Sequence, residues 1–183
     1  MAETILETTR LRLRTWDSGD VAPFMAALND DAVMQWLGGR ASAAQYQTMY
    51  ERMCACQAAH GYCFWLMERQ SDAQLLGFCG LYVTNRPDSP VDGRVEIGWR
   101  LRADVWGQGY AREAAEASLT YGFGTIGLPQ ILAYTVKKNA ASWGLMQRLG
   151  MVRARALDHR LSGYGDDVAD QIVYRIDRGD WMV

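Results

Sequence analysis

The 183-residue sequence predicts a mixed α/β layer fold with seven strands. Two observations support this prediction. The hydrophobic period switches repeatedly between 2 and 3.6, and a strand–helix–strand unit lies near the middle of the chain. The expected order of elements is β-α-α-β-β-β-α-β-α-β-β. Because parallel strands need a crossover connection, the central β-α-β unit should form the parallel part of the sheet.

The chain is expected to open with one strand and two helices. Residues 9–14 alternate between leucine and arginine, which indicates a strand with one solvated face. Asp17 or Ser18 can cap a first helix, and Ser42 can cap a second. The apolar stripes of these helices are Val21, Phe24, Met25 and Leu28 in the first, and Tyr46, Met49, Tyr50 and Met53 in the second.

A run of strands follows. Residues 63–68 and 75–84 are expected to form an antiparallel hairpin around the polar turn 69–74. Residues 85–93 contain two Pro, two Asp and a Gly and predict a loop, after which residues 94–101 form a fourth strand.

The C-terminal half alternates helices and strands. Residues 111–123 place small or apolar side chains on one continuous helix face, which favours close packing on a sheet. Residues 131–136 predict a strand, and Asn139 can cap a helix that ends at Gly150. Two last strands are expected at 151–157 and 171–176, on either side of the polar segment 158–170.

Charge and hydropathy exclude several classes of protein. The 21 acidic and 19 basic groups give a net charge of −2, whereas a nucleic-acid binder usually carries a basic excess. No apolar run approaches the roughly 20 residues that a membrane helix needs, and no signal peptide is expected. We therefore expect a cytoplasmic protein that binds neither nucleic acid nor membrane.

The four cysteines predict neither a zinc site nor disulfides. Their spacing matches no zinc-ligand pattern, and the chain has only two histidines to help. We expect four reduced and mostly buried thiols, and no bound metal. These cysteines are Cys54, Cys56, Cys63 and Cys79.

The most informative segment is a glycine-rich loop between a strand and a helix. Gly107 and Gly109 allow the backbone to approach a ligand, and the free amides at the start of the following helix attract anions. The loop lacks the Lys-Ser/Thr of a nucleotide-triphosphate loop, and Arg112 replaces the third glycine of a dinucleotide fingerprint. On these residues alone, a diphosphate site and a tight turn with nothing bound are equally good interpretations.

The order of four short segments resembles the GCN5-related N-acetyltransferase (GNAT) superfamily, over residues 8–176. Within it the chain is most similar to the RimJ/RimL branch, whose known members acetylate the N-termini of ribosomal proteins. The opening Thr9-Arg10-Leu11-x-Leu13-Arg14 also resembles that branch. The four segments are Glu96-Ile97-Gly98-Trp99-x-Leu101, Trp106-Gly107-Gln108-Gly109-Tyr110-Ala111, Asn139-x-x-Ser142 and Leu149-Gly150-Met151.

The resemblance implies a GNAT fold, a mixed and mostly antiparallel seven-stranded sheet flanked by helices, with a central parallel β-α-β unit that binds the cofactor. It also implies one N-acetyltransferase domain over residues 1–183, and acetyl-CoA as the acetyl donor. The acceptor would be an amine, either on a small molecule or at a protein N-terminus, and would attack the thioester directly in a ternary complex. The resemblance also implies these cofactor-binding residues: Trp99, Arg100, Leu101, Trp106, Gly107, Gln108, Gly109, Tyr110, Ala111, Arg112, Asn139 and Ser142.

Two residues are candidates for catalysis. Glu96 is expected to accept a proton from the amine, since only a neutral amine is a nucleophile; it could instead be a strand residue paired with Arg94 or Arg100. Many members of the superfamily carry a tyrosine on the last helix that protonates the departing thiolate, and that position is Met146 here. Ser142, one turn earlier, is the alternative donor.

Other features leave the acceptor open. His159 lies in a polar loop, where it could reach a substrate or simply be solvated. Lys137 and Lys138 could attract the phosphates of CoA or form a solvated pair at a strand end. Loop aspartates weakly suggest a cationic acceptor. A small-molecule acetyltransferase and a non-catalytic acyl-CoA sensor are both alternatives, and the protein could be a monomer or a homodimer. The loop aspartates are Asp88, Asp92, Asp166, Asp167 and Asp170.

Overall fold

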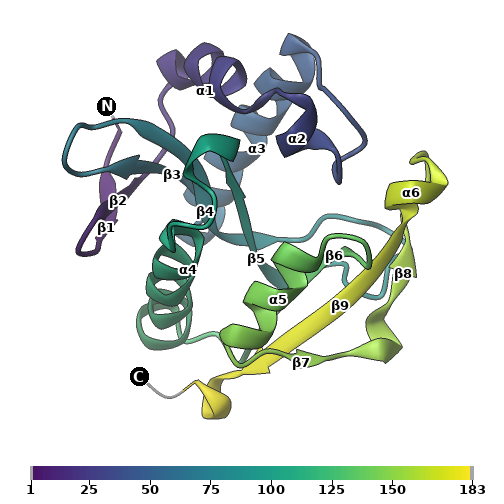
Figure 1. Cartoon of the computed structure of the whole chain (residues 1–183). Coiled ribbons are helices and arrows are strands. Elements are labelled where there is room, and N and C mark those ends of the chain that lie inside the picture. Colours follow the sequence, from purple (N-terminus) through teal and green to yellow (C-terminus); the bar gives the residue numbers. More distant parts are fainter. Residues whose placement is uncertain (1, 182–183) are drawn as a thin grey trace.

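A computed structural model describes residues 2–181 and contains one nine-stranded sheet (Figure 1). The strands run in the order β1-β2-β3-β4-β5-β6-β9-β7, with β8 paired to β9. Every pair of neighbours is antiparallel except β5 and β6. The strands are β1 (Thr4–Glu7), β2 (Leu11–Arg14), β3 (Phe64–Arg69), β4 (Leu75–Val83), β5 (Val95–Leu101), β6 (Gln130–Val136), β7 (Val152–Arg153), β8 (His159–Arg160) and β9 (Asp170–Asp177).

Helices cover both faces of the sheet. The first three lie together at the top of Figure 1, and α1 packs on both α3 and β4. On the other face α4 packs on β4 and β5, and α5 contacts β6. The helices are α1 (Val21–Leu28), α2 (Asp31–Met34), α3 (Ala43–His60), α4 (Tyr110–Thr120, followed by a π-helical segment Tyr121–Ile126), α5 (Ala140–Arg148) and α6 (Asp166–Ala169).

The predicted caps are present. Asp17 forms a capping box with Asp20 on a short 3-10 turn that leads into α1, and Ser42 forms one with Gln45 at the start of α3. The Asn139 side chain accepts a hydrogen bond from the Ser142 amide at the start of α5. Each cap satisfies amides that have no partner within their own helix.

The predicted fold is confirmed, but the strand count of seven was too low. Strand β1 reads Thr-Ile-Leu-Glu, in which the two apolar residues are adjacent and do not alternate with polar ones, and β8 has only two residues. The strand expected at 151–157 was too long, because only Val152–Arg153 pairs with β9 before a 3-10 turn begins at Arg155. Short α2 and α6 were also not predicted.

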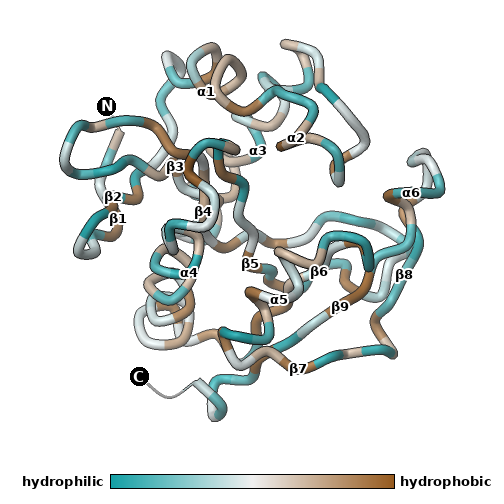
Figure 2. Tube along the Cα trace, in the orientation of Figure 1, coloured by the Kyte–Doolittle hydropathy of each residue, from teal (hydrophilic) through white to brown (hydrophobic). Residues whose placement is uncertain are grey.

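The core lies on both faces of the central strands. Trp65, Leu66 and Met67 follow one another in β3 and are all fully buried, which requires a packed layer on each face. Figure 2 shows the hydrophobic stretches of the trace mainly on the inner elements, while most peripheral turns are hydrophilic. The central strands therefore hold β5 rigidly from the β4 side.

The sheet opens between β5 and β6. Strand β5 pairs with β4 along its whole length, from Val95 to Leu101. With β6 it shares a single pairing position, Glu96 opposite Leu132. Beyond this point the two parallel strands diverge, which leaves one edge of β5 without a strand partner.

Three further properties follow from the described residues. No helix within residues 2–181 has the length and apolar character needed to cross a bilayer. The same part of the chain contains no group of three or more His, Cys, Asp and Glu side chains that could hold a metal ion. All four cysteines are free thiols, as predicted, and three of them are buried.

Candidate active site

The glycine-rich loop forms a cradle at the start of α4. Gly109 occupies the N-cap position with φ +84, a left-handed conformation that favours glycine. No side chain caps this helix, so its first backbone amides stay available to a ligand. A Cβ at Gly107 would meet nothing within 4 Å, so the loop is open on that side. These features fit an anionic group such as a diphosphate.

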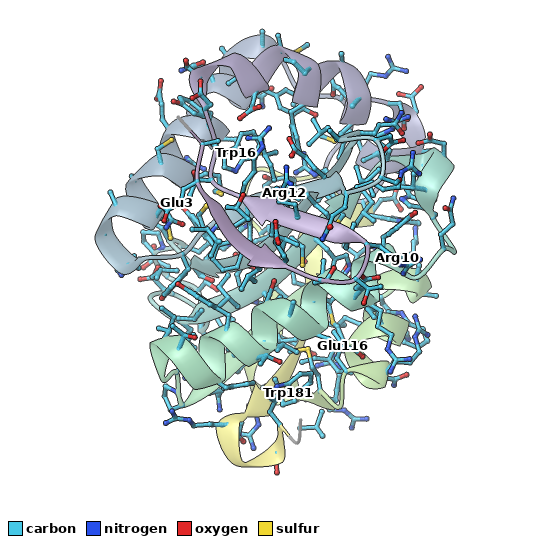
Figure 3. The ribbon with its side chains drawn as sticks, turned by 90° about the vertical axis from the view of Figure 1, so that its left-hand side faces the viewer. Glu3, Arg10, Arg12, Trp16, Glu116 and Trp181 are labelled. Atoms are coloured by element: carbon cyan, nitrogen blue, oxygen red, sulfur yellow. The ribbon has the colours of Figure 1, made fainter. Side chains whose placement is uncertain are left out.

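The N-terminal hairpin holds this loop in place (Figure 3). Arg10, at the turn between β1 and β2, donates from Nη1 to the Gln108 carbonyl at 2.9 Å. Its Nε lies 2.6 Å from Oε2 of Glu113, in the first turn of α4, and its guanidinium stacks over Tyr110 at 4.4 Å. Thr8 donates to the same carboxylate at 2.6 Å. Burial opposes the charge of Glu113, but these bonds outweigh it and lower the pKa of the carboxyl.

The unpaired edge of β5 presents the backbone groups of Trp99. The carbonyl oxygen of Arg100 points at β4, where a Cβ on Gly77 would lie 2.0 Å from it. Backbone groups alternate sides along a strand, so those of Trp99 face the split between β5 and β6. The next group facing the split, the Leu101 carbonyl, accepts a bond from the Trp106 indole at 2.9 Å. Trp99 is thus free to pair with an extended ligand.

The loop, the split and the start of α5 open into one cavity of ≈ 780 Å³. Helix α2 and the chain near α6 supply its opposite walls. Gln108 does not line the cavity, because its side chain donates to the Asp104 carbonyl and its own carbonyl is held by Arg10. The predicted residues that do line it are Glu96, Trp99, Arg100, Leu101, Trp106, Gly107, Gly109, Tyr110, Ala111, Arg112, Asn139 and Ser142.

Glu96 lies where β5 and β6 begin to diverge, and it belongs to a polar cluster. Its Oε1 accepts a hydrogen bond from the Tyr134 hydroxyl of β6 at 2.8 Å. The same hydroxyl accepts a bond from Nε of Arg86 at 3.2 Å. Arg86 belongs to the loop between β4 and β5, so three elements meet at the carboxylate.

The surroundings of Glu96 raise its pKa to about 7. Burial is the largest cause, and it outweighs the Tyr134 hydrogen bond and the charge of Arg86, which both favour the carboxylate. A carboxyl that titrates near neutral pH is suited to accept a proton from an amine. Burial also raises the pKa of Tyr134, so this hydroxyl remains protonated and serves as a donor.

The start of α5 forms the wall opposite β5. Asn139 caps the helix, and its Nδ2 donates to the Thr135 hydroxyl of β6 at 3.1 Å. Ser142 is partly buried and lines the cavity one helical turn before Met146, which is almost fully buried. Ser142 therefore brings a hydroxyl to the cavity wall, whereas the thioether of Met146 has no proton to donate.

The sequence analysis missed Tyr134, the direct partner of Glu96. Alternation along 131–136 shows that Tyr134 and Leu132 share a face, but the register between β5 and β6 is not visible in the sequence. The other candidates lie outside the cavity. The His159 ring packs against Tyr134 at 5.5 Å, Lys138 pairs with Asp167, and Arg160 pairs with Asp166 and Asp170.

Comparison with known families gives one clear match. Residues 10–152 match the model of the acetyltransferase (GNAT) domain. YkkB of Bacillus subtilis (strain 168) is 31% identical over 151 residues, which cover 82% of this chain and 86% of YkkB. The uncharacterized N-acetyltransferase YoaA of the same organism is 28% identical over 155 residues, 84% of this chain and 85% of YoaA.

Solved structures share the fold at low identity. The spermidine N-acetyltransferase of Vibrio cholerae, solved in complex with CoA and spermine, superposes with a TM-score of 0.72 at 17% identity, over 95% of this chain and 99% of that one. RimL, a ribosomal L7/L12 alpha-N-protein acetyltransferase, superposes with a TM-score of 0.77 at 18% identity, over 97% and 95% of the two chains.

Because burial raises the pKa of Glu96 above its unfolded value, this group should destabilise the protein as pH rises from about 4.5 to about 7. Glu96→Gln removes the titration but keeps an acceptor for Tyr134. We expect the variant to be more stable than wild type at pH 8, by up to about 3 kcal/mol, and nearly equal at pH 4. Urea unfolding at both values measures this, and an equal difference at both would contradict the assigned pKa.

Proposed function

The chain belongs to the GNAT family of acetyltransferases, and from this premise we propose that it is an N-acetyltransferase that transfers acetyl from acetyl-CoA to a primary amine. The observation that carries the proposal is the split between β5 and β6, where the glycine cradle and Glu96 open into one cavity. The proposal covers residues 1–183 as one domain, acting in the cytoplasm as a monomer or homodimer.

The proposed acetyl-CoA site uses the features of the split. The free amides at the start of α4 would bind the diphosphate, with Gly107 and Gly109 allowing it to come close. The backbone of Trp99 would pair with the pantetheine arm as an added strand, because that edge has no strand partner. Asn139 and Ser142 would flank the thioester from α5, and the exposed Arg112 lies at the phosphate end.

The proposed reaction is a direct transfer. The neutral amine attacks the thioester carbonyl carbon, the C–N bond forms, and the C–S bond breaks as thiolate leaves. Glu96 takes the proton from the amine, directly or through water, while Tyr134 and Arg86 hold the carboxylate. Ser142 donates a hydrogen bond to the departing sulfur. The neutral amine gives up one proton, which Glu96 accepts and the thiolate finally takes up. The products are therefore the amide and the CoA thiol, and no covalent enzyme intermediate is needed.

The acceptor is a small amine or a protein N-terminus in this proposal. Membership of the RimJ/RimL branch would favour the second, on the strength of the opening strand and loop sequence. Within residues 2–181 nothing favours a non-catalytic acyl-CoA sensor, because the carboxyl that titrates near neutral pH faces the cavity.

Release of CoA from acetyl-CoA, measured over a panel of primary amines, tests the function. On an accepted amine, Glu96→Gln should lower kcat by about 10²–10⁴-fold and remove the rise of kcat through pH 7. Higher pH should partly restore the variant, because more amine is then neutral. Tyr134→Phe removes a bond to the carboxylate and should move the rise to higher pH. A wild-type profile in Glu96→Gln would refute the assigned role.

Acetyl-CoA binding depends on the cradle in this proposal. Gly109→Val places a branched side chain where the backbone would meet diphosphate, and we expect loss of binding by calorimetry. The matched control is Gly127→Val, at the end of the π-helical segment that follows α4. Both glycines have φ near +80, and a Cβ at each lies 3.3 or 3.6 Å from an arginine Nη2, so strain is similar. Equal binding by the two variants would contradict the placement.

The leaving group depends on Ser142 in this proposal. Ser142→Ala should slow the single-turnover rate by at most about 30-fold, roughly 2 kcal/mol, and leave the Kd of acetyl-CoA within a few-fold. Met146→Tyr in the same background should restore part of the rate, because i and i+4 side chains share a helix face. Equal single-turnover rates for wild type and Ser142→Ala would show that the thiolate leaves without this hydroxyl.

A further inference from the structure

The charged side chains that line the cavity do not suit a polycationic amine. Five charged side chains line it, of which only Glu96 is acidic. None of the loop aspartates that could attract a cation lines the cavity, and three of them form ion pairs with Lys138 or Arg160. Beside Glu96, a second or third ammonium group would therefore meet the guanidinium groups of Arg86 and Arg100 instead of carboxylates. The four arginines are Arg86, Arg100, Arg112 and Arg148.

Arg100 has no role in the proposed reaction. The resemblance includes it among the cofactor-binding residues, but its carbonyl points at β4 and away from the split. Ten of the seventeen arginines have a carboxylate within the 4.0 Å ion-pair distance, and Arg100 is not among them in the part of the chain that the structure describes. Of the seven other arginines, only Arg86 and Arg100 are partly buried, and the remaining five are exposed. Arg86 is accounted for by Tyr134 and by the nearby charge of Glu96.

The surroundings of Arg100 are apolar and aromatic. Its guanidinium lies over the Phe78 ring at 5.2 Å, and Phe78 stacks on Phe64 at 5.0 Å. Burial lowers the pKa of the guanidinium, and the hydroxyl of Tyr46 offsets this only in part. A buried cation without a partner of opposite charge is costly. An anion that binds beside it in the same cavity offsets that cost.

Glu96 and Arg100 lie on the same face of β5. Residues at i and i+4 of a strand point to the same side, roughly 13 Å apart along the chain. Gly98 lies between them, and the Phe64 ring covers it. A Cβ on Gly98 would lie 2.7 Å from that ring. The floor between the proton acceptor and the cation is therefore a flat aromatic surface.

We propose that the acceptor carries an anionic group, a carboxylate or a phosphate, in addition to its amine, and that Arg100 binds this group while the amine lies beside Glu96. The proposal rests on the proposed function and narrows its substrate class. It selects linear amino carboxylates, amino phosphates or peptides with an acidic side chain near the N-terminus, long enough to extend from Glu96 to Arg100, over polyamines and neutral amines.

Matched pairs of amines test this with the full chain and acetyl-CoA. One arm uses linear amino carboxylates of increasing length, each against the carboxamide of the same length. A second arm uses the corresponding amino phosphates against amino alcohols, which distinguishes the two anions. Spermidine is the polycationic comparison. We expect the anionic member of at least one pair to have a kcat/KM about 10- to 100-fold higher, as for a charge-assisted hydrogen bond.

Arg100→Met should reduce that preference to less than about threefold, mainly through the KM of the anionic amine, and Arg100→Lys should retain part of it. Arg148→Met is the matched control, because Arg148 lines the same cavity but is exposed and lies on α5. It should affect both members of a pair equally.

Three outcomes would overturn the inference. Transfer to neutral amines or spermidine without preference for the anionic member would do so and leave the proposed function intact. An equal loss for both members in Arg100→Met would assign Arg100 to packing on Phe78. Failure to acetylate any amine, despite acetyl-CoA binding, would refute the proposed function and the inference with it.

Discussion

The divergence of two parallel strands is the constraint on which the rest of this structure depends. Strand β5 is fixed along its length by β4, and β6 by β9, so both strands are rigid while sharing a single pairing position at Glu96. A sheet that opens in its middle exposes backbone groups that must find another partner. Here the glycine cradle, the N-terminus of α5 and the carboxyl of Glu96 line the opening. The unpaired strand edge therefore becomes one wall of a binding site.

The cradle is supported from a distant part of the chain. Arg10 of the β1–β2 hairpin forms a partly exposed ion pair with Glu113, and the same arginine holds the Gln108 carbonyl and stacks on Tyr110. This arrangement orients the loop and also neutralises a carboxylate in the first turn of α4, where an uncompensated charge would repel an anionic ligand. The first strands, which do not touch the cavity, thereby contribute to its electrostatics.

The two ends of the cavity differ in chemical character. At the glycine cradle, the first backbone amides of α4 have no side-chain cap and Arg112 is exposed. On the face toward α2, Glu96 is surrounded by groups that oppose one another: burial favours its protonated form, while Tyr134 and Arg86 favour the carboxylate. The balance falls near neutral pH, where a proton acceptor is most useful. Arg100 adds a cation on the same strand face, above an aromatic floor.

The sequence by itself determined the local parts of this site. The glycine loop, the Ser42 and Asn139 caps and the crossover around α4 were all predictable, because each depends on residues a few positions apart. Short strands β1 and β8 were not, since their pairing partners and not their composition define them. Only the tertiary structure brought Tyr134 to Glu96, 38 residues away, and Glu113 to Arg10, 103 residues away. These contacts depend on strand register and helix packing, which no local pattern encodes.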